Sequence, residues 1–161
     1  PMGVLTNNPP FDMQLFGLNR YMGLSAEQVT NHFSKELELK TYSRGMGSLG
    51  LPGDWTSPSR FVRAAFTRMN AVSGNSEEES VSQFFHMLGS VAHPRGCVHM
   101  GDNQYEITVY SSCCNTNKGI YYYTTYDNHQ ITAVHLHREK LDDRFLVRYP
   151  LVQGEQMAHQ N

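Results

Sequence analysis

The hydrophobic period of the sequence changes partway along the chain, and this change constrains the fold more than any other feature. Between residues 58 and 88 the apolar residues recur at the spacing of an α-helix. After Gly101 they alternate with a period of two in runs rich in β-branched and aromatic residues: "YEITVYSS", "IYYYTTY" and "ITAVHLH". The short turns between these runs, "CCNTNKG" and "DNHQ", predict an antiparallel meander. The expected fold class is therefore α+β.

Two amphipathic helices are expected before the meander. Pro58 suits the first helical position of the earlier helix, with Thr56 or Ser57 as its cap. One face of this helix collects apolar side chains and the other collects polar ones: Phe61, Ala65, Met69 and Val72, flanked by Val62 and Phe66, against Arg60, Arg63, Thr67 and Asn70. In the later helix Ser76 and Glu79 have the spacing of a capping box. Its expected buried stripe is Val81, Phe84, Phe85 and Leu88. Residues 2–6 and 145–149 are expected to form short strands, and residues 25–33 a short helix.

Length and charge exclude some classes of protein. With 161 residues the chain is long enough for a single unit with its own core, spanning residues 1–161. A formal net charge of -2, with scattered lysines and arginines, gives no electrostatic basis for binding nucleic acid. No apolar stretch approaches the roughly 20 residues that cross a bilayer, so no membrane insertion is expected.

Cysteine usage favours a reducing compartment. The chain has three cysteines, Cys97, Cys113 and Cys114, and an odd number with one adjacent pair is a poor disulfide framework. Free thiols and a cytoplasmic location are the simpler interpretation. Each cysteine is expected to be a small buried hydrophobe rather than a catalytic group. The eight histidines have no cysteine or carboxylate at the usual spacing of a metal site, so no metal is expected.

The glycine-rich stretch "YSRGMGSLGLPGDW" contains a formal match to G-x-G-x-x-G at Gly45, Gly47 and Gly50. A dinucleotide site needs a buried strand before this motif and a helix opening within it. The preceding "ELELKTYSR" is not a strongly apolar strand, and Pro52 and Gly53 forbid an immediate helix. The glycines are therefore expected to allow a close approach of backbone segments.

Three polar residues, Arg60, Asn7 and Asn8, lie at positions that suit catalytic chemistry. Arg60 falls in the first turn of a helix, where the helix dipole disfavours a cation. It is either a functional residue or a solvated surface arginine. Asn7 and Asn8 directly follow the expected strand, and a side-chain amide there can donate to a developing oxyanion or simply form a turn. The residues alone identify no nucleophile and leave these alternatives open.

Several long segments, in order and with similar spacing, resemble one known family. They are "GVLTNNPPFD", "YSRGMGSLGLPGDWTSPSRFVRAAFTRMN", "SVSQFFHMLGSV", "YEITVYSSCCN" and "KGIYYYTTYDNHQITAV". Together they resemble the conjugated bile salt hydrolases (choloylglycine hydrolases), relatives of penicillin V acylase among the N-terminal-nucleophile hydrolases. "YSRGMG…GLPGD" and "YSSCCN" place the resemblance nearer to the bile salt enzymes. The resemblance implies part of an αββα sandwich, in which outer helices cover two antiparallel sheets.

The resemblance also implies a mechanism and assigns two residues to it. Family members use an N-terminal cysteine as nucleophile, with its own amino group as the base. The chain aligns with the C-terminal half, so the cysteine is expected in an N-terminal half absent from this chain, and the isolated chain is expected to be inactive. In "LTNNP", Asn7 matches the asparagine that helps form the oxyanion hole. In "SPSRF", Arg60 matches the arginine beside the nucleophile, where a cation favours the thiolate.

The remaining implications concern substrate and assembly. Glycine- or taurine-conjugated bile salts would be cleaved at their amide bond through an acyl-enzyme, without a metal or organic cofactor. The missing half would be a partner, and the intact enzyme would be a homotetramer. The alternatives are a penicillin V acylase and a non-catalytic binding or assembly module of the same fold. Because half of a sandwich leaves a sheet face uncovered, the isolated chain is expected to self-associate or to need its other half.

Overall fold

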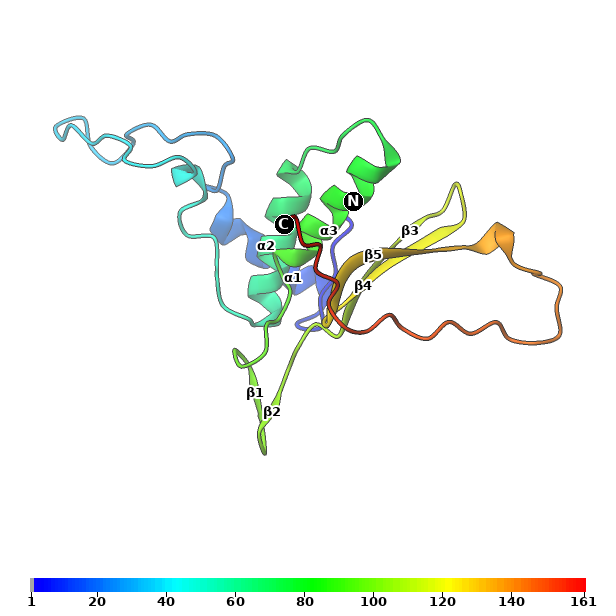
Figure 1. The fold of residues 1–161 in the computed structure, drawn as a ribbon. Helices are drawn as coiled ribbons and strands as arrows, with labels where there is room; N and C mark the ends of the chain where they lie inside the picture. The colour runs from blue at the N-terminus through cyan, green and yellow to red at the C-terminus, as the bar shows by residue number, and fades with distance from the viewer. Residues whose placement is uncertain (1) are drawn as a thin grey trace. The chain divides into compact units, whose positions relative to one another are not determined.

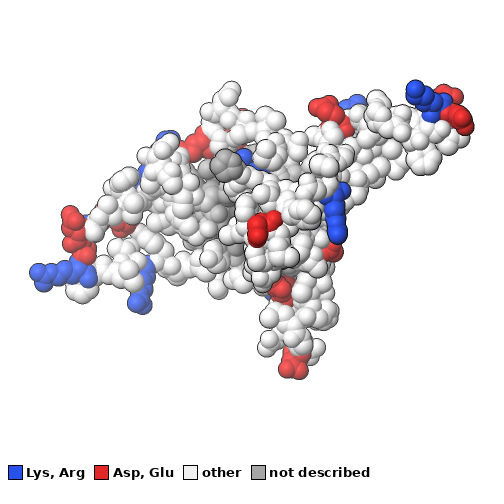
Figure 2. Space-filling view, turned by 180° about the vertical axis from the view of Figure 1, so that it is seen from behind, with Lys and Arg blue, Asp and Glu red and all other residues white. Residues whose placement is uncertain are grey.

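The computed structural model describes residues 2–161, which divide into two compact units, 1–71 and 72–161 (Figure 1). The expectation of a single unit over residues 1–161 stays a prediction, and each unit is described by itself. Figure 2 shows charged side chains scattered over the face drawn, and among the residues described there Lys and Arg form no continuous basic patch. Of the helices in residues 2–161, none combines the length and the apolar character that crossing a bilayer requires.

The first unit is helical and irregular. It contains α1 (Phe11–Gly17), the 3-10 helices η1 (Leu18–Tyr21) and η2 (Met46–Ser48), and α2 (Ser57–Asn70). The predicted helix with Thr56 as N-cap and proline in its first turn is confirmed as α2. Phe61 of α2 is fully buried and meets the Phe11 ring of α1 edge-on, with centroids 6.1 Å apart. Burying a phenylalanine side chain contributes about 1.5–3 kcal/mol, so this contact anchors the small core of the unit.

The predicted division of α2 into an apolar and a polar face is only partly right. Phe61, Val62 and Ala65 are buried, whereas Met69 is 68% exposed. Arg63, expected on the solvent side, is only 8% exposed. Its guanidinium donates to two backbone carbonyls of the preceding loop, and these hydrogen bonds compensate for the burial of a charge. The core thus covers the first turns of the helix, and the apolar stripe beyond them faces solvent.

The short strand expected over residues 2–6 and the helix expected over residues 25–33 are absent from the described structure. Gly3 has a φ of 65°, which breaks an extended run. In the second segment side chains replace the helical hydrogen bonds. The Asn31 amide donates to the carbonyls of Ser34 and Leu37, and the Ser25 hydroxyl accepts from the Glu27 N–H. Such local side-chain bonds compete with a helix.

The glycine-rich stretch brings two backbone segments together, as expected. A Cβ built on Gly47 would lie 2.6 Å from the Ser25 carbonyl oxygen and nearer still to that of Glu27. The Ser25 N–H donates to the Gly47 carbonyl at 2.8 Å. Only η2 forms within the described G-x-G-x-x-G match, and no strand precedes it in residues 2–44. The context of a dinucleotide site is therefore missing from this part of the chain.

The second unit contains one helix and two antiparallel sheets. After α3 (Glu77–Gly89) come the hairpin β1 (His99–Gly101) and β2 (Gln104–Tyr105) and the sheet β3 (Tyr110–Asn115), β4 (Ile120–Thr125) and β5 (Asn128–His135), followed by η3 (Leu136–Arg138). The sheet order β3-β4-β5 confirms the predicted meander. Its first predicted run is split, because Tyr105 pairs with His99 in the separate hairpin. The strand expected at 145–149 is wrong, since these residues form no regular element.

The capping box of α3 is confirmed, but the buried stripe is not. Ser76 Oγ accepts from the Glu79 N–H at 3.0 Å, and Glu79 Oε2 accepts from the Ser76 N–H at 3.0 Å. No described residue of α3 is fully buried, and Phe84 is 36% exposed. The core of this unit lies instead on β4, where Ile120 and Tyr123 are buried. The apolar face of α3 therefore stays only half covered.

A carboxylate ties α3 to the β3–β4 hairpin. Glu77 Oε1 accepts from the Asn115 amide at 2.5 Å and from the Tyr122 hydroxyl at 2.8 Å, and Glu77 Oε2 accepts from Lys118 Nζ at 2.5 Å. The bond from Lys118, followed by that from Tyr122, lowers the pKa of Glu77 to about 2. Burial and the same carboxylate raise the pKa of Tyr122 to about 12. Glu77 is thus a tertiary anchor between the first turn of α3 and the hairpin.

Candidate active site

The loop that carries Asn7 is held against the start of α2. Thr6 Oγ1 donates to the Ser57 carbonyl at 3.1 Å, and the Asn8 N–H donates to Ser57 Oγ at 3.0 Å. Gln14 of α1, only 3% exposed, closes the loop from the other side by donating to the Pro9 carbonyl at 2.5 Å. Polar side chains thus replace backbone pairing and bring an irregular segment next to the first turn of a helix.

The structure brings the two predicted site residues together. Arg60 Nη2 donates to Asn7 Oδ1 at 3.1 Å, across 53 positions of sequence. Arg60 Nε donates to the Trp55 carbonyl at 3.3 Å. A guanidinium has only donors, so the Asn7 oxygen must face it and the Asn7 NH₂ group must point elsewhere. The pair therefore combines a cation with an amide whose donor side is turned away from that cation.

Asp54 organises the first turn of α2. Its Oδ1 accepts from the Thr56 N–H at 3.0 Å and from Thr56 Oγ1 at 2.5 Å, while Oδ2 accepts from Ser59 Oγ at 2.5 Å. The bond from Ser59, followed by those from Thr56, lowers the pKa of Asp54 to about 2. Thr56 holds the N-cap position but makes no capping bond with its side chain. The Asp54 carboxylate thus ties the N-cap residue to the Ser59 side chain and places negative charge near the positive end of the helix.

Arg63 lies one turn further along α2, and its guanidinium contacts residues 52–55 before the helix. Its Nη1 donates to the Pro52 carbonyl at 2.9 Å and to the Asp54 carbonyl at 2.6 Å. Its guanidinium carbon lies 5.5 Å from the centroid of the Trp55 ring, within range of a cation–π contact. Burial lowers the pKa of Arg63, with Asp54 opposing this shift and the neighbouring charge of Arg60 adding to it.

Sequence reasoning missed Gln14, Asp54 and Arg63. An aspartate two residues before a helix cap is a recognisable signal, because a carboxylate there can reach the first N–H groups. A buried arginine on the nominally polar face of a helix, and a buried glutamine within a short one, carry no such signal in the periodicity. Both residues bond to carbonyls of irregular segments, and helical periodicity says nothing about where those segments lie.

The other residues considered from the sequence do not form a site. Cys97, Cys113 and Cys114 are free, as expected, but Cys97 and Cys114 are exposed rather than buried. Burial raises the pKa of the Cys113 thiol, which is half-buried. Within residues 2–161 no group of three His, Cys, Asp or Glu side chains is placed to hold a metal ion.

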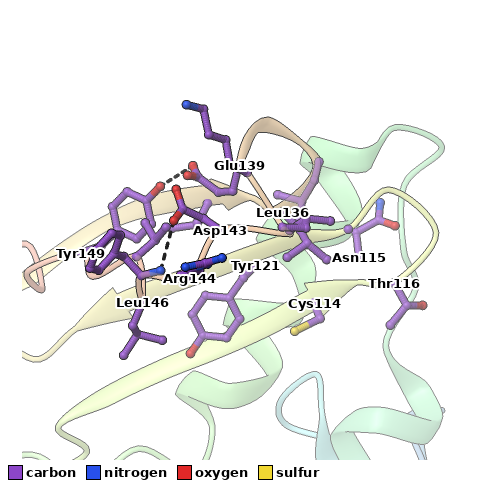
Figure 3. A pocket seen from close by; sticks show the side chains of 17 residues that line it. Cys114, Asn115, Thr116, Tyr121, Leu136, Glu139, Asp143, Arg144, Leu146 and Tyr149 are labelled. Carbon is purple, nitrogen blue, oxygen red and sulfur yellow. Dashed lines mark hydrogen bonds between the residues drawn. The ribbon is translucent and has the colours of Figure 1, made fainter.

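The second unit contains a hollow of about 830 Å³ between the sheet and the irregular segment 139–149 (Figure 3). Its lining is mainly apolar and comes from residues 114–149, including Tyr121, Leu136 and Phe145. The Tyr149 hydroxyl donates to the Glu139 carboxylate at its rim. Neither Asn7 nor Arg60, which belong to the first unit, is among its lining residues.

Comparison with known proteins agrees with the resemblance. Residues 1–149 match the family model of linear amide C–N hydrolases, choloylglycine hydrolase family. The bile salt hydrolase/transferase of Lactiplantibacillus plantarum is 58% identical over 151 residues, which are 94% of this chain and 47% of the relative. The bile salt hydrolase/transferase of Clostridium perfringens is 38% identical over 160 residues, which are 99% of this chain and 49% of the relative.

Solved structures give the same picture. The crystal structure of a variant conjugated bile acid hydrolase from Clostridium perfringens matches with a TM-score of 0.87, covering 99% of this chain and 49% of that chain at 38% identity. A penicillin V acylase from Agrobacterium tumefaciens, 20% identical with a TM-score of 0.56, shares the fold over 83% of this chain and 36% of that chain. The expected fold class is confirmed. The chain spans about half the length of the curated relatives it matches.

Proposed function

Because the chain belongs to the choloylglycine hydrolase family of linear amide C–N hydrolases, we propose that it is the C-terminal part of a bile salt hydrolase. The complete enzyme cleaves the amide bond of glycine- or taurine-conjugated bile salts through a cysteine acyl-enzyme. The observation that carries this proposal is the hydrogen bond between Arg60 and Asn7, the two residues that the family resemblance assigns to the site. They supply the cation and the amide that this chemistry requires.

Each residue has a separate role in the proposed reaction. The Arg60 guanidinium stabilises the thiolate form of the nucleophile and so lowers its pKa. Asn7 donates from its NH₂ group to the oxyanion that forms when the thiolate attacks the substrate carbonyl. The contact between Asn7 Oδ1 and Arg60 supports this role, because it fixes the amide with its donors directed away from the guanidinium. Fixed donors need no reorientation as negative charge develops.

The nucleophile, the assembly and the compartment complete the proposal. The nucleophilic cysteine comes from a segment outside these 161 residues, in keeping with relatives about twice as long. The three free cysteines favour a reducing compartment, and we place the enzyme in the cytoplasm. The complete enzyme assembles as a homotetramer and needs no cofactor.

The test compares matched variants of the protein that carries this chain. Glycine release from glycocholate is measured for the unchanged protein, for Asn7→Ala and for the neighbouring Asn8→Ala. Loss of one oxyanion donor lowers kcat roughly 10²- to 10³-fold, so Asn7→Ala is expected to fall by that amount. Asn8→Ala retains the backbone N–H that bonds Ser57, and its kcat is expected to stay within about twofold of the unchanged protein. Equal losses in the two variants would refute the assignment of Asn7.

The substrate class is tested by a competing amide. The penicillin V acylase match is evidence of a common fold only, so penicillin V is offered to the same protein beside glycocholate. Faster turnover of penicillin V would replace the bile salt proposal with an acylase. Hydrolysis of neither substrate by the full-length protein would indicate the non-catalytic module. The 161-residue chain alone is expected to release no glycine, and activity from it would contradict the division of the site.

A further inference from the structure

Arg63 contacts three of the four residues 52–55, which lie just before the N-cap of α2. It donates to the carbonyls of Pro52 and Asp54, and its guanidinium lies over the Trp55 ring. The side chain is only 8% exposed. Burial of a guanidinium is costly unless it is hydrogen-bonded, and an apolar side chain could fill a similar volume without that cost. The use of a cation here therefore calls for a reason beyond packing.

The segment that Arg63 holds is the same one that holds Arg60. The Trp55 carbonyl accepts from Arg60 Nε at 3.3 Å, which is near the long limit for this kind of bond. Because that bond is already near the limit, a small displacement of the Trp55 carbonyl would break it and release one of the contacts that place Arg60. Arg63 restrains Trp55 through two contacts. It donates to the carbonyl of Asp54, the preceding residue, and its guanidinium lies over the Trp55 ring.

The charges add a second observation. Arg60 and Arg63 are close enough for the charge of one to lower the pKa of the other. Arg60 and Arg63 stand three residues apart on α2, where neighbouring like charges are unfavourable, and Arg63 is buried. Such local conflicts between stability and arrangement are typical of functional sites. Asp54 moderates this conflict, and its carboxylate also organises the first turn from which Arg60 projects.

We propose that Arg63 is a positioning residue: by fixing the backbone of residues 52–55 it aims the Arg60 guanidinium at Asn7 and at the reacting thiol. The inference rests on the proposed function, because it assigns Arg63 a task in the same site. Arg63 contacts neither substrate nor thiol in this scheme and acts only through Arg60. An effect of Arg63 on catalysis should therefore vanish when Arg60 is absent.

The test is a double-mutant cycle in the full-length protein. Arg63→Met and Arg63→Lys are made with Arg60 intact and in an Arg60→Ala background, with Arg68→Met as the control on an exposed position of the same helix. A misplacement of about 1 Å can cost 10²-fold in rate, so Arg63→Met is expected to lower kcat roughly 10- to 100-fold with a smaller change in KM. In the Arg60→Ala background the same change should alter kcat less than about twofold.

Arg63→Lys preserves the positive charge but loses the planar guanidinium that lies over Trp55, so it should recover folding more than rate. It also serves if Arg63→Met fails to fold. The acid limb of the profile of kcat/KM against pH should move to higher pH in both Arg63 variants. A displaced Arg60 stabilises the thiolate less and so leaves the thiol with a higher pKa. Arg68→Met should leave kcat and the pH profile unchanged. Equal losses of kcat in the two backgrounds, or an unshifted acid limb, would overturn the positioning role.

A crystal structure of the Arg63→Lys protein separates this inference from the proposed function. Loss of the Arg60–Asn7 hydrogen bond, or several conformers of Arg60, is expected; an unchanged 3.1 Å contact would overturn the positioning role. If Arg60→Ala itself retains the kcat of the unchanged protein, the catalytic assignment of Arg60 fails. The crystal structure still decides in that case whether Arg63 places Arg60.

Discussion

Replacing Gly47 by alanine tests whether the glycine-rich stretch is a close backbone contact. A Cβ at this position would lie 2.6 Å from the Ser25 carbonyl oxygen, where ordinary van der Waals contact begins at 3.4 Å. The obstructing atoms are backbone carbonyls rather than the ends of flexible side chains. The two segments must therefore separate by roughly 0.8 Å or more. Such a shift would stretch the 2.8 Å hydrogen bond from the Ser25 N–H to the Gly47 carbonyl beyond useful length.

The magnitude follows from three contributions. Overpacking costs about 1–3 kcal/mol, and losing the Ser25 hydrogen bond costs about 1 kcal/mol more. Alanine also restricts the unfolded chain, which offsets about 0.4–1 kcal/mol. The net destabilisation is expected to be about 1–3 kcal/mol. Gly53→Ala is the matched control in the same stretch, because its Cβ would meet nothing within 4 Å and its φ is not left-handed. It should be neutral or slightly stabilising.

Hydrogen exchange of the Ser25 amide, measured by mass spectrometry on the peptide that contains it, reports the local opening directly. A cost of about 1–3 kcal/mol corresponds to a loss of protection of roughly 5- to 150-fold in Gly47→Ala. Gly53→Ala should retain the protection of the unchanged protein. Equal protection of Ser25 in the two variants would refute the close-contact interpretation of Gly47.

Three further predictions concern stability. Phe61→Ala should lower the free energy of unfolding by about 3–5 kcal/mol, because Phe61 is fully buried against Phe11; a loss below about 1 kcal/mol in urea titration would contradict this core. Asp54 and Glu77 have folded pKa values of about 2 against ordinary values of 3.8 and 4.5. Their contribution to the free energy of unfolding should therefore be fully present above about pH 5 and be lost as the pH falls toward 2. Glu77→Gln should make the melting temperature depend less on pH over this range. The 161-residue chain alone should self-associate in analytical ultracentrifugation, and a dilute monomer with a cooperative melt would argue against this.

The sequence predicted elements whose cause is local and missed features whose cause lies elsewhere in the fold. The capping box at Ser76 and the meander were predictable, since neighbouring residues alone determine both. The burial of Arg63 was not, because it depends on carbonyls of a loop that helical periodicity cannot place. Residues 25–33 look helical by composition, yet Asn31 and Ser25 bond to the backbone instead.

The candidate site shows the same division. Nothing local to Asn7 or Arg60 says that they meet across 53 positions, and the family resemblance supplied that pairing. The sequence alone indicates that the positive charge of Arg60 is unfavourable in the first turn of a helix, where the helix dipole is also positive. The structure adds two acceptors for the Arg60 guanidinium, the Trp55 carbonyl and Asn7 Oδ1.

The asparagine that faces Arg60 is a weaker partner than the chemistry of that position permits. An aspartate at position 7 would offer the guanidinium a charge-assisted, two-pronged acceptor and would hold it more firmly. In the proposed reaction, that exchange would also remove the NH₂ group and place a negative charge beside the developing oxyanion. If the proposed function holds, stability and catalysis therefore favour different residues at position 7.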